Sequence, residues 1–152
     1  MDYVTNIRRK IGHDPLLLVG VAVIHLGEPD TLLLVRKNNG DWGLPGGLME
    51  LGETPEQTAQ RELYEELSVH ASGLQLVTVL SGPDFMFALP NEDQVCMVTI
   101  LYETCGLEGE LQPDREEITA YAYHHLQELA AVVPARTHKL IQAWQSRMRL
   151  SS

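Results

Sequence analysis

The stretch RELYEEL, residues 61–67, contains three carboxylates next to a single cation, Arg61. Positions three and four apart are neighbours on a helix, so Glu62 would lie beside both Glu65 and Glu66. Each like-charged pair of this kind destabilises a helix by roughly 0.2–0.5 kcal/mol. A divalent cation would relieve the repulsion, because converging carboxylates offer the hard oxygen ligands that Mg²⁺ and Mn²⁺ prefer. The alternative interpretation is a solvated acidic face, although such faces usually mix charges of both signs.

These acidic residues belong to a helix whose start is well marked. Thr54 is a suitable N-cap, Pro55 suits the first helical position, and Gln57 completes a capping box with Thr54. We therefore expect a helix from about Pro55 to Leu67. Leu63 and Leu67 belong to an apolar stripe on it, and the three glutamates lie on the adjacent stripe, at the edge of the buried face.

The segment before this helix should bring backbone close to the carboxylates. Residues 38–47, NNGDWGLPGG, are rich in Gly, Asn and Pro and are predicted to form a loop. Gly46 and Gly47 carry no Cβ, so the chain can approach closely there. Glu53 adds a further acid beside the start of the helix.

The remaining elements suggest an α/β fold with a mixed β-sheet between helices, because strands and helices do not alternate strictly. A short helix is predicted at 3–11, and a C-terminal helix from about Pro134 carries Leu140, Trp144 and Met148 on one face. The predicted β-strands are 16–26, 31–37, 74–80, 85–89, 94–104 and 118–124.

Composition and charge narrow the functional classes. The 152 residues are 44% hydrophobic and 21% charged, as expected of a single soluble domain, here with residues 1–14 as an N-terminal helical arm. The net charge of −10 and the pI near 4.9 argue against nucleic acid as a partner. The longest apolar stretch, 15–26, is too short to span a membrane. Cys96 and Cys105 form no CxxC pair and are expected to be reduced core thiols of a cytoplasmic protein, with a disulfide or metal pair as the alternative.

Residues 47–69 resemble the signature box of the Nudix hydrolases. That pattern is Gly, five residues, Glu, seven residues, then Arg-Glu-apolar-x-Glu-Glu-x-Gly-apolar. The matching residues of this chain are Gly47, Glu53, Arg61, Glu62, Leu63, Glu65, Glu66 and Val69. Ser68 stands where the pattern has glycine, at the helix end, where glycine makes a better C-cap. More loosely, the resemblance extends from Pro15 to about Leu129 and is to small bacterial members of the family.

The resemblance implies a Nudix-type α/β/α sandwich and hydrolysis of a nucleoside diphosphate linked to another moiety, such as ADP-ribose or a nucleoside triphosphate. It implies Mg²⁺ or Mn²⁺ held by Gly46, Glu62, Glu65 and Glu66, with the last two also counted as catalytic. Arg61 would orient a carboxylate. The partner would be a small-molecule nucleotide derivative, and a homodimer is compatible with the family.

Three further residues are candidates for the site. Glu117 resembles the acid that some Nudix enzymes bring from a late loop as general base; a plain solvated turn is the alternative. Arg36 could clamp a phosphate through its bidentate guanidinium, or be a surface arginine at a strand end. Phe85 and Phe87 alternate in an apolar run, so Phe85 could stack on a nucleobase or pack in the core.

Two other functions remain as alternatives. One is a Nudix domain that senses a nucleotide without catalysis, although such sensors usually carry a DNA-binding module or a damaged box. The other is an isomerase acting on an isoprenoid diphosphate, which would need a deliberately placed reactive cysteine.

Overall fold

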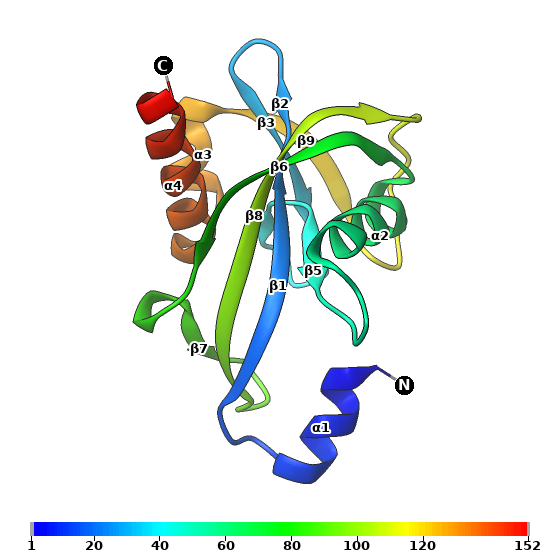
Figure 1. Cartoon of the computed structure of the whole chain (residues 1–152), viewed down its shortest axis with the longest axis vertical. Helices are drawn as coiled ribbons and strands as arrows, with labels where there is room; N and C mark the ends of the chain where they lie inside the picture. The colour runs from blue at the N-terminus through cyan, green and yellow to red at the C-terminus, as the bar shows by residue number, and fades with distance from the viewer. Residues whose placement is uncertain (1, 152) are drawn as a thin grey trace.

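The computed structural model describes residues 2–151 and shows helices on both sides of the central strands (Figure 1). The helices are α1 (Tyr3–Ile11), α2 (Pro55–Leu67), α3 (Leu129–Val132) and α4 (Ala135–Ser151), with 3₁₀ helices η1 (Pro83–Phe85) and η2 (Leu126–Glu128). The strands are β1 (Leu16–Ile24), β2 (Leu26–Gly27), β3 (Thr31–Arg36), β4 (Trp42–Gly43), β5 (Gly46–Leu48), β6 (His70–Leu80), β7 (Met86–Ala88), β8 (Gln94–Glu108) and β9 (Ala120–His125). Helix α2 lies on one side and α4 on the other, which confirms the expected α/β/α architecture.

The strands divide into two sheets. One has the order β5-β1-β8-β6, with β7 also paired to β8. It is mixed, because β1 and β8 run parallel, from Leu16 opposite Val95 to Ile24 opposite Glu103, while the other pairs are antiparallel. The second sheet is antiparallel and places β3 between β4 and β9, with β2 also paired to β3.

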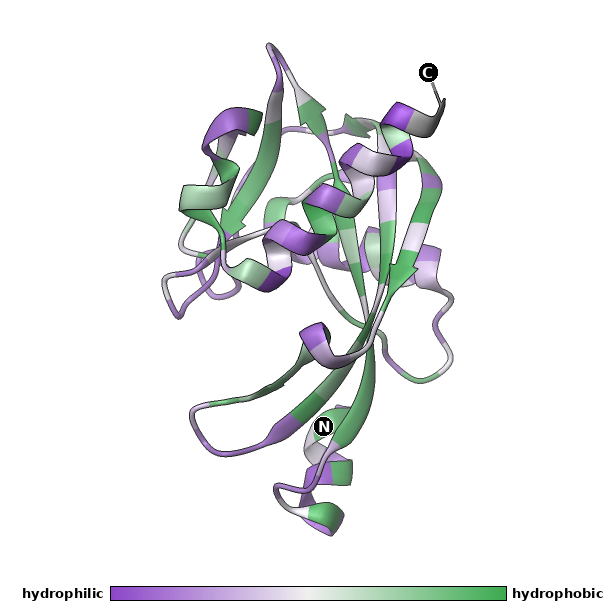
Figure 2. Ribbon diagram, turned by 90° about the vertical axis from the view of Figure 1, so that its left-hand side faces the viewer, coloured by the Kyte–Doolittle hydropathy of each residue, from purple (hydrophilic) through white to green (hydrophobic). Residues whose placement is uncertain are grey.

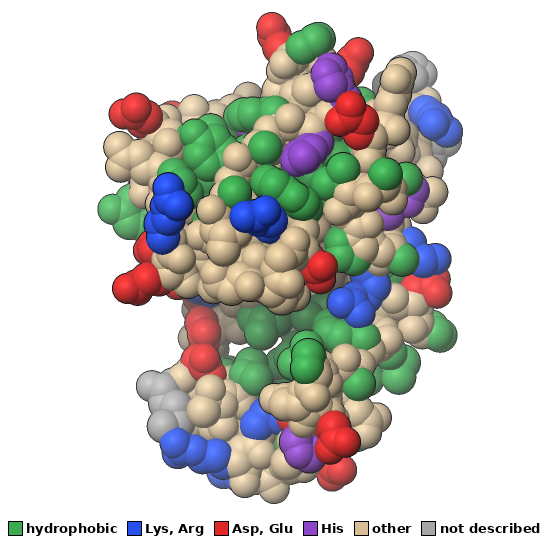
Figure 3. Space-filling view, turned by 180° about the vertical axis from the view of Figure 1, so that it is seen from behind, with side chains coloured by type: hydrophobic (Ala, Val, Ile, Leu, Met, Phe, Trp, Pro, Cys, Tyr) green, Lys and Arg blue, Asp and Glu red, His purple; other side chains and the backbone are tan. Residues whose placement is uncertain are grey.

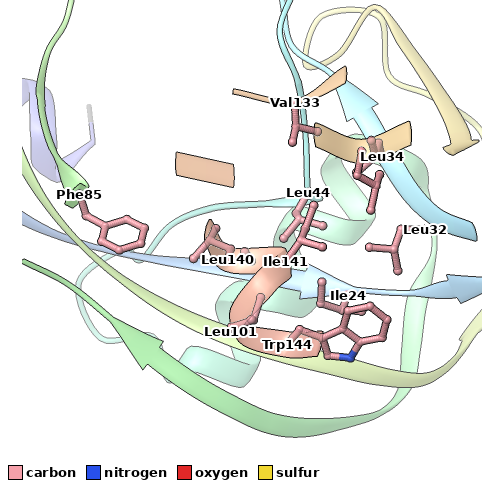
Figure 4. Close-up of a cluster of buried hydrophobic side chains, with 12 residues drawn as sticks. Ile24, Leu32, Leu34, Leu44, Phe85, Leu101, Val133, Leu140, Ile141 and Trp144 are labelled. Atoms are coloured by element: carbon pink, nitrogen blue, oxygen red, sulfur yellow. The ribbon is translucent and has the colours of Figure 1, made fainter. Parts of the chain in front are cut away.

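Strands β1 and β3 are apolar along most of their length because they contribute to two cores at once. Their alternate residues Ile24, Leu32 and Leu34 join α4 in one cluster, in which Trp144 is the largest side chain (Figure 4). Intervening residues such as Val23 and Leu33 join α2 in a second cluster on the opposite side. Figure 2 shows the same division: the strands are largely hydrophobic, whereas α4 carries hydrophilic residues on its outer side.

Helix α2 has the predicted bounds and the predicted caps. The Thr54 hydroxyl accepts a hydrogen bond from the Gln57 N–H (3.1 Å), and the Gln57 side chain accepts one from the Thr54 N–H (2.9 Å). At the other end Ser68 adopts a left-handed conformation (φ 62°, ψ 29°), the geometry for which the family pattern uses glycine.

Some expected boundaries differ. The predicted loop 38–47 contains short strand β4 and the start of β5, because its backbone pairs with β3 and β1. The predicted strand 85–89 begins as the 3₁₀ helix η1, so Phe85 and Phe87 do not alternate on one strand. Phe85 is buried and points into the cluster of α4 (Figure 4). In the C-terminal helix Leu140 and Trp144 are buried as predicted, but Met148 is exposed.

The N-terminal arm is held by Arg8 and by apolar side chains of α1 that pack against Leu16, Leu18 and Val95. The Arg8 guanidinium donates to the backbone carbonyls of Asp14 and Gln94, each at 2.6 Å, and so ties α1 to the start of β8. Cys96 and Cys105 are both free thiols, as expected, but Cys96 is only partly buried and Cys105 is exposed, so the expected core position is wrong. Within residues 2–151 no helix is long and apolar enough to cross a membrane.

Candidate active site

Arg61 holds together carboxylates from α2 and from the loop before it. Its Nε and one terminal nitrogen donate to the two oxygens of Glu53 at 2.7 and 3.0 Å. The same guanidinium donates to Glu62 (3.0 Å), to Glu65 (3.1 Å) and to the carbonyl of Leu48 (2.9 Å). Hydrogen bonding to Glu53 raises the pKa of Arg61, and bonding to Arg61 lowers the pKa of Glu53 to about 2. Arg61 therefore fixes the start of α2 to β5 and sets the direction of two acidic side chains.

Glu66 lies deeper, with only 2% of its surface exposed. One carboxylate oxygen accepts the N–H of Gly46 at 2.9 Å, and the other forms an ion pair with Lys37. The Lys37 ammonium also donates to the Gly46 carbonyl at 3.4 Å. Burial raises the pKa of Glu66, and the positive charge of Lys37 opposes that rise. Sequence reasoning missed Lys37, which follows β3 and lies 29 positions before Glu66.

Glu62 lies between these two groups. Burial, together with the negative charge of Glu66, raises the pKa of Glu62 to about 7, although Arg61 donates to it. Its carboxylate occupies the space in which a Cβ on Gly47 would lie. A Cβ on Gly46, whose φ is +146°, would collide with the Val21 carbonyl. Both glycines are therefore required by close packing, as the sequence suggested.

Two of the expected metal-binding groups already hold a cation, the Lys37 ammonium. It contacts both the Gly46 carbonyl and the Glu66 carboxylate, two of the four groups expected to bind metal. Among the described residues, however, no three His, Cys, Asp or Glu side chains are grouped closely enough to hold a metal ion. Glu62 and Glu65 are turned toward Arg61, and Glu66 toward Lys37.

Glu117 lies in an exposed turn next to the end of α2. The N–H groups of Gln112 and Asp114 donate to the carbonyls of Leu67 and Glu66 at 2.9 and 3.0 Å, which docks this loop against the helix. The negative charge of Glu117 contributes to the raised pKa of Glu66, so the two carboxylates are electrostatic neighbours. The structure thus brings Glu117 to the same end of α2 as Glu66.

The structure places the other two candidates differently. Arg36 is exposed at the end of β3; its Nε donates to the Thr119 hydroxyl at 2.9 Å, and its guanidinium lies 5.8 Å from the centre of the Trp42 ring. It is next to Lys37 in the chain but contacts none of the box carboxylates. Phe85 is packed in the core beneath α4, and the structure does not bring it to the site.

An apolar cavity of about 210 Å³ lies on the other side of the glycine segment. Its wall includes Leu18, Leu48, Phe87 and Met97. A Cβ on Gly20 would lie 3.4 Å from both the Gly47 carbonyl and the Met97 sulfur, so the cavity adjoins the chain that passes Glu62. Seen from behind, a hollow with hydrophobic side chains separates the end of the molecule that carries α1 from the rest (Figure 3).

The edge of this cavity carries a cation stacked on an aromatic ring. The Arg136 guanidinium lies 3.5 Å from the centre of the Phe87 ring. Partial burial lowers the pKa of Arg136, whereas the charge of Asp41 acts in the opposite direction. An arginine on an aromatic face, beside an apolar cavity, is a combination that can hold a planar ring carrying negative groups.

Residues 16–144 match the family model described as NUDIX domain. An ADP-ribose pyrophosphatase from Methanocaldococcus jannaschii is 33% identical over 115 residues, which are 72% of this chain and 66% of that protein. A MutT-like protein from Streptomyces ambofaciens is 42% identical over 66 residues, 43% of each chain. The chain thus spans less than two thirds of the length of these relatives. The solved structure of the NUDIX domain of Shewanella oneidensis NrtR, in complex with ADP ribose, superposes with a TM-score of 0.69 at 21% sequence identity. The match covers 96% of each chain and shows a likeness of fold alone.

Proposed function

The chain belongs to the Nudix hydrolase family, and on this premise we propose that it hydrolyses the pyrophosphate bond of a nucleoside diphosphate linked to another moiety. The observation that carries the proposal is the buried Glu66 at the Gly46 turn, with Glu62 beside it and a cation already in contact with the Gly46 and Glu66 oxygens. Water would attack one phosphorus atom, a new P–O bond would form, and the bridging P–O bond would break. The products would include a nucleoside monophosphate.

A divalent cation, Mg²⁺ or Mn²⁺, would be held by the Gly46 carbonyl and by Glu62, Glu65 and Glu66. When bound, such an ion neutralises diphosphate charge and acidifies the attacking water. This also accounts for how a chain of net charge −10 binds an anion. Arg61 would keep Glu62 and Glu65 in place, and its contact with the Leu48 carbonyl supports this role.

Glu117 would accept the proton of the attacking water. It lies outside the predicted metal ligands but next to Glu66, in a loop that is docked on α2 by backbone hydrogen bonds. A base in this position is free to exchange its proton with solvent after each turnover, because its side chain is exposed.

The apolar cavity would receive the nucleoside. Phe87 with the stacked Arg136 would bind the base, and the diphosphate would then extend past Gly47 toward Glu62. Arg36 would contact an outer phosphate only after its hydrogen bond to the Thr119 hydroxyl breaks. Phe85 has no part in this arrangement, because it is buried in the core.

The relatives point to two substrate groups, ADP-ribose and nucleoside triphosphates. The M. jannaschii relative is described as an ADP-ribose pyrophosphatase, whereas a Bacillus subtilis relative is described as a putative 8-oxo-dGTP diphosphatase. We propose that one of these is the substrate class and that the protein acts in the cytoplasm, which the two free cysteines support.

A substrate panel tests the proposal. The protein is incubated with Mg²⁺ or Mn²⁺ and ADP-ribose, ordinary and oxidised nucleoside triphosphates, or sugar phosphates, and the products are identified by mass spectrometry. We expect the unaltered protein to release a nucleoside monophosphate. Glu66→Gln should lose both turnover and metal binding. The control Glu110→Gln, which changes an exposed acid outside the site, should turn over normally. Turnover of sugar phosphates alone would overturn the substrate class. Nucleotide binding without turnover would favour the sensor instead.

A further inference from the structure

Lys37 reaches the site from a different part of the chain than the acidic residues. It follows the last residue of β3, and its backbone is fixed by a hydrogen bond from its N–H to the Asp41 carbonyl at 2.8 Å. Its ammonium group pairs with one oxygen of Glu66 and donates to the Gly46 carbonyl at 3.4 Å. The N–H of Gly46 in turn donates to the other Glu66 oxygen. One ammonium group therefore bridges two of the predicted metal ligands.

Glu66 needs such a partner. A carboxylate that is 2% exposed loses most of its hydration, and an unpaired charge in that position strongly disfavours the folded state. Among the ion pairs of residues 2–151, Lys37 is the cation that contacts Glu66, whereas Arg61 contacts Glu53, Glu62 and Glu65. The carboxylates are thus shared between two cationic side chains, Lys37 and Arg61.

We propose that Lys37 is the built-in counter-ion of Glu66 and that a divalent cation binds Gly46 and Glu66 by displacing its ammonium group. The inference rests on the proposed function, which names those two residues as metal ligands. Lys37 and the metal ion would use the same two oxygen atoms, so both cannot be fully bound at once. Metal binding then replaces the singly charged ammonium group at Glu66 with a divalent cation.

The displaced ammonium group of Lys37 can move into solvent. The Lys37 side chain is 37% exposed, whereas that of Glu66 is 3% exposed, so the stem of the lysine leads from the buried carboxylate to solvent. A flexible four-carbon stem allows the ammonium to swing outward. In that position it can donate to an oxygen of a bound diphosphate. The same residue would stabilise Glu66 before loading and contact substrate after it.

The affinity of the Lys37→Met variant for metal tests whether a divalent cation displaces the Lys37 ammonium group. Mn²⁺ affinity is measured by electron paramagnetic resonance at about pH 8, where protonation of carboxylates competes least. Since metal no longer has to break a charge-assisted hydrogen bond, we expect Lys37→Met to bind Mn²⁺ roughly tenfold or more tightly than the unaltered protein. Lys37→Arg, which keeps the charge, and Lys139→Met, which removes an exposed lysine paired with Asp84, should bind as the unaltered protein does.

A second measurement, nuclear magnetic resonance of the unaltered protein, tests the proposal even if the Lys37→Met variant does not fold. The lysines are Lys10, Lys37 and Lys139, so three ε-CH₂ signals of ¹³C-labelled lysine report on the whole set. Titration with Mg²⁺ should move the Lys37 signal and leave the other two in place. A stationary Lys37 signal at saturating Mg²⁺, or unchanged or weaker Mn²⁺ binding by folded Lys37→Met, would overturn the proposal. Hydrolysis is scored separately, so metal exchange without turnover would reject the proposed function alone.

Discussion

Removal of the Arg61–Glu53 ion pair should destabilise the fold far more than removal of an ion pair at the surface. The pair is bidentate, with N–O distances of 2.7 and 3.0 Å, and the side chains are only 27% and 18% exposed. A charge-assisted hydrogen bond contributes roughly 1.5–3 kcal/mol when shielded from water, and partial exposure reduces this. We therefore expect a coupling free energy of about 2 kcal/mol in a double-mutant cycle of Arg61→Met and Glu53→Gln. In a domain of this size that corresponds to about 4–8 °C in melting temperature.

The coupling should also depend on pH in a defined direction. Bonding to Arg61 lowers the pKa of Glu53 from 4.5 to about 2. A carboxylate whose pKa is lower in the folded state stabilises that state above its unfolded pKa, and the contribution disappears as pH falls through the folded pKa. The coupling should thus be complete above about pH 5 and decline between about pH 4.5 and 2, as measured by urea unfolding at a series of pH values.

Lys139 and Asp84 provide the matched control. Their N–O distance of 3.1 Å is similar, but the side chains are 44% and 64% exposed. Exposed pairs contribute roughly 0.2–1 kcal/mol, so the cycle of Lys139→Met and Asp84→Asn should give a much smaller coupling. A coupling at Arg61–Glu53 no larger than this control, or one that persists unchanged at low pH, would refute the reasoning.

Two further predictions concern the end of α2 and the proposed base. Ser68→Gly should raise the free energy of unfolding by about 0.5–1 kcal/mol, because glycine adopts the left-handed conformation at position 68 without strain; a melting temperature that is unchanged or lower contradicts this. Glu117→Gln should lower kcat by about 10²–10⁴ while Mn²⁺ affinity stays nearly normal, and full activity in this variant would place the general base elsewhere.

The features predicted correctly from sequence depend on short-range geometry. The Thr54–Gln57 capping box fixes the start of α2 through contacts three residues apart, so the sequence alone specifies it. The position of Glu66 follows from the same helix, since it lies beside the apolar stripe of Leu63 and Leu67 and is buried with them. The closeness of Gly46 to this carboxylate was likewise predictable, because glycine is required where backbone approaches a side chain.

The features that were missed depend on tertiary contacts. Lys37 meets Glu66 only because β3 ends beside the Gly46 turn, and no local pattern shows which strand ends there. Phe85 and Phe87 have similar neighbours in sequence, yet the 3₁₀ helix turns Phe85 into the core and leaves Phe87 beside the cavity. The separation of the strands into two sheets likewise depends on pairings that alternation of apolar residues does not specify.

The parallel pairing of β1 with β8 determines the order in which this chain can fold during synthesis. Its first register pair, Leu16 and Val95, lies 79 positions apart, and β1 pairs with β5 only in its middle, from Gly20 to Ala22. The first half of β1 therefore has no strand partner until residue 95 and those after it have left the ribosome. During that interval the nascent chain carries an unpaired, strongly apolar strand, the kind of segment to which chaperones bind. The hydrogen bond from Arg8 of helix α1 to the Gln94 carbonyl can likewise form only after that interval.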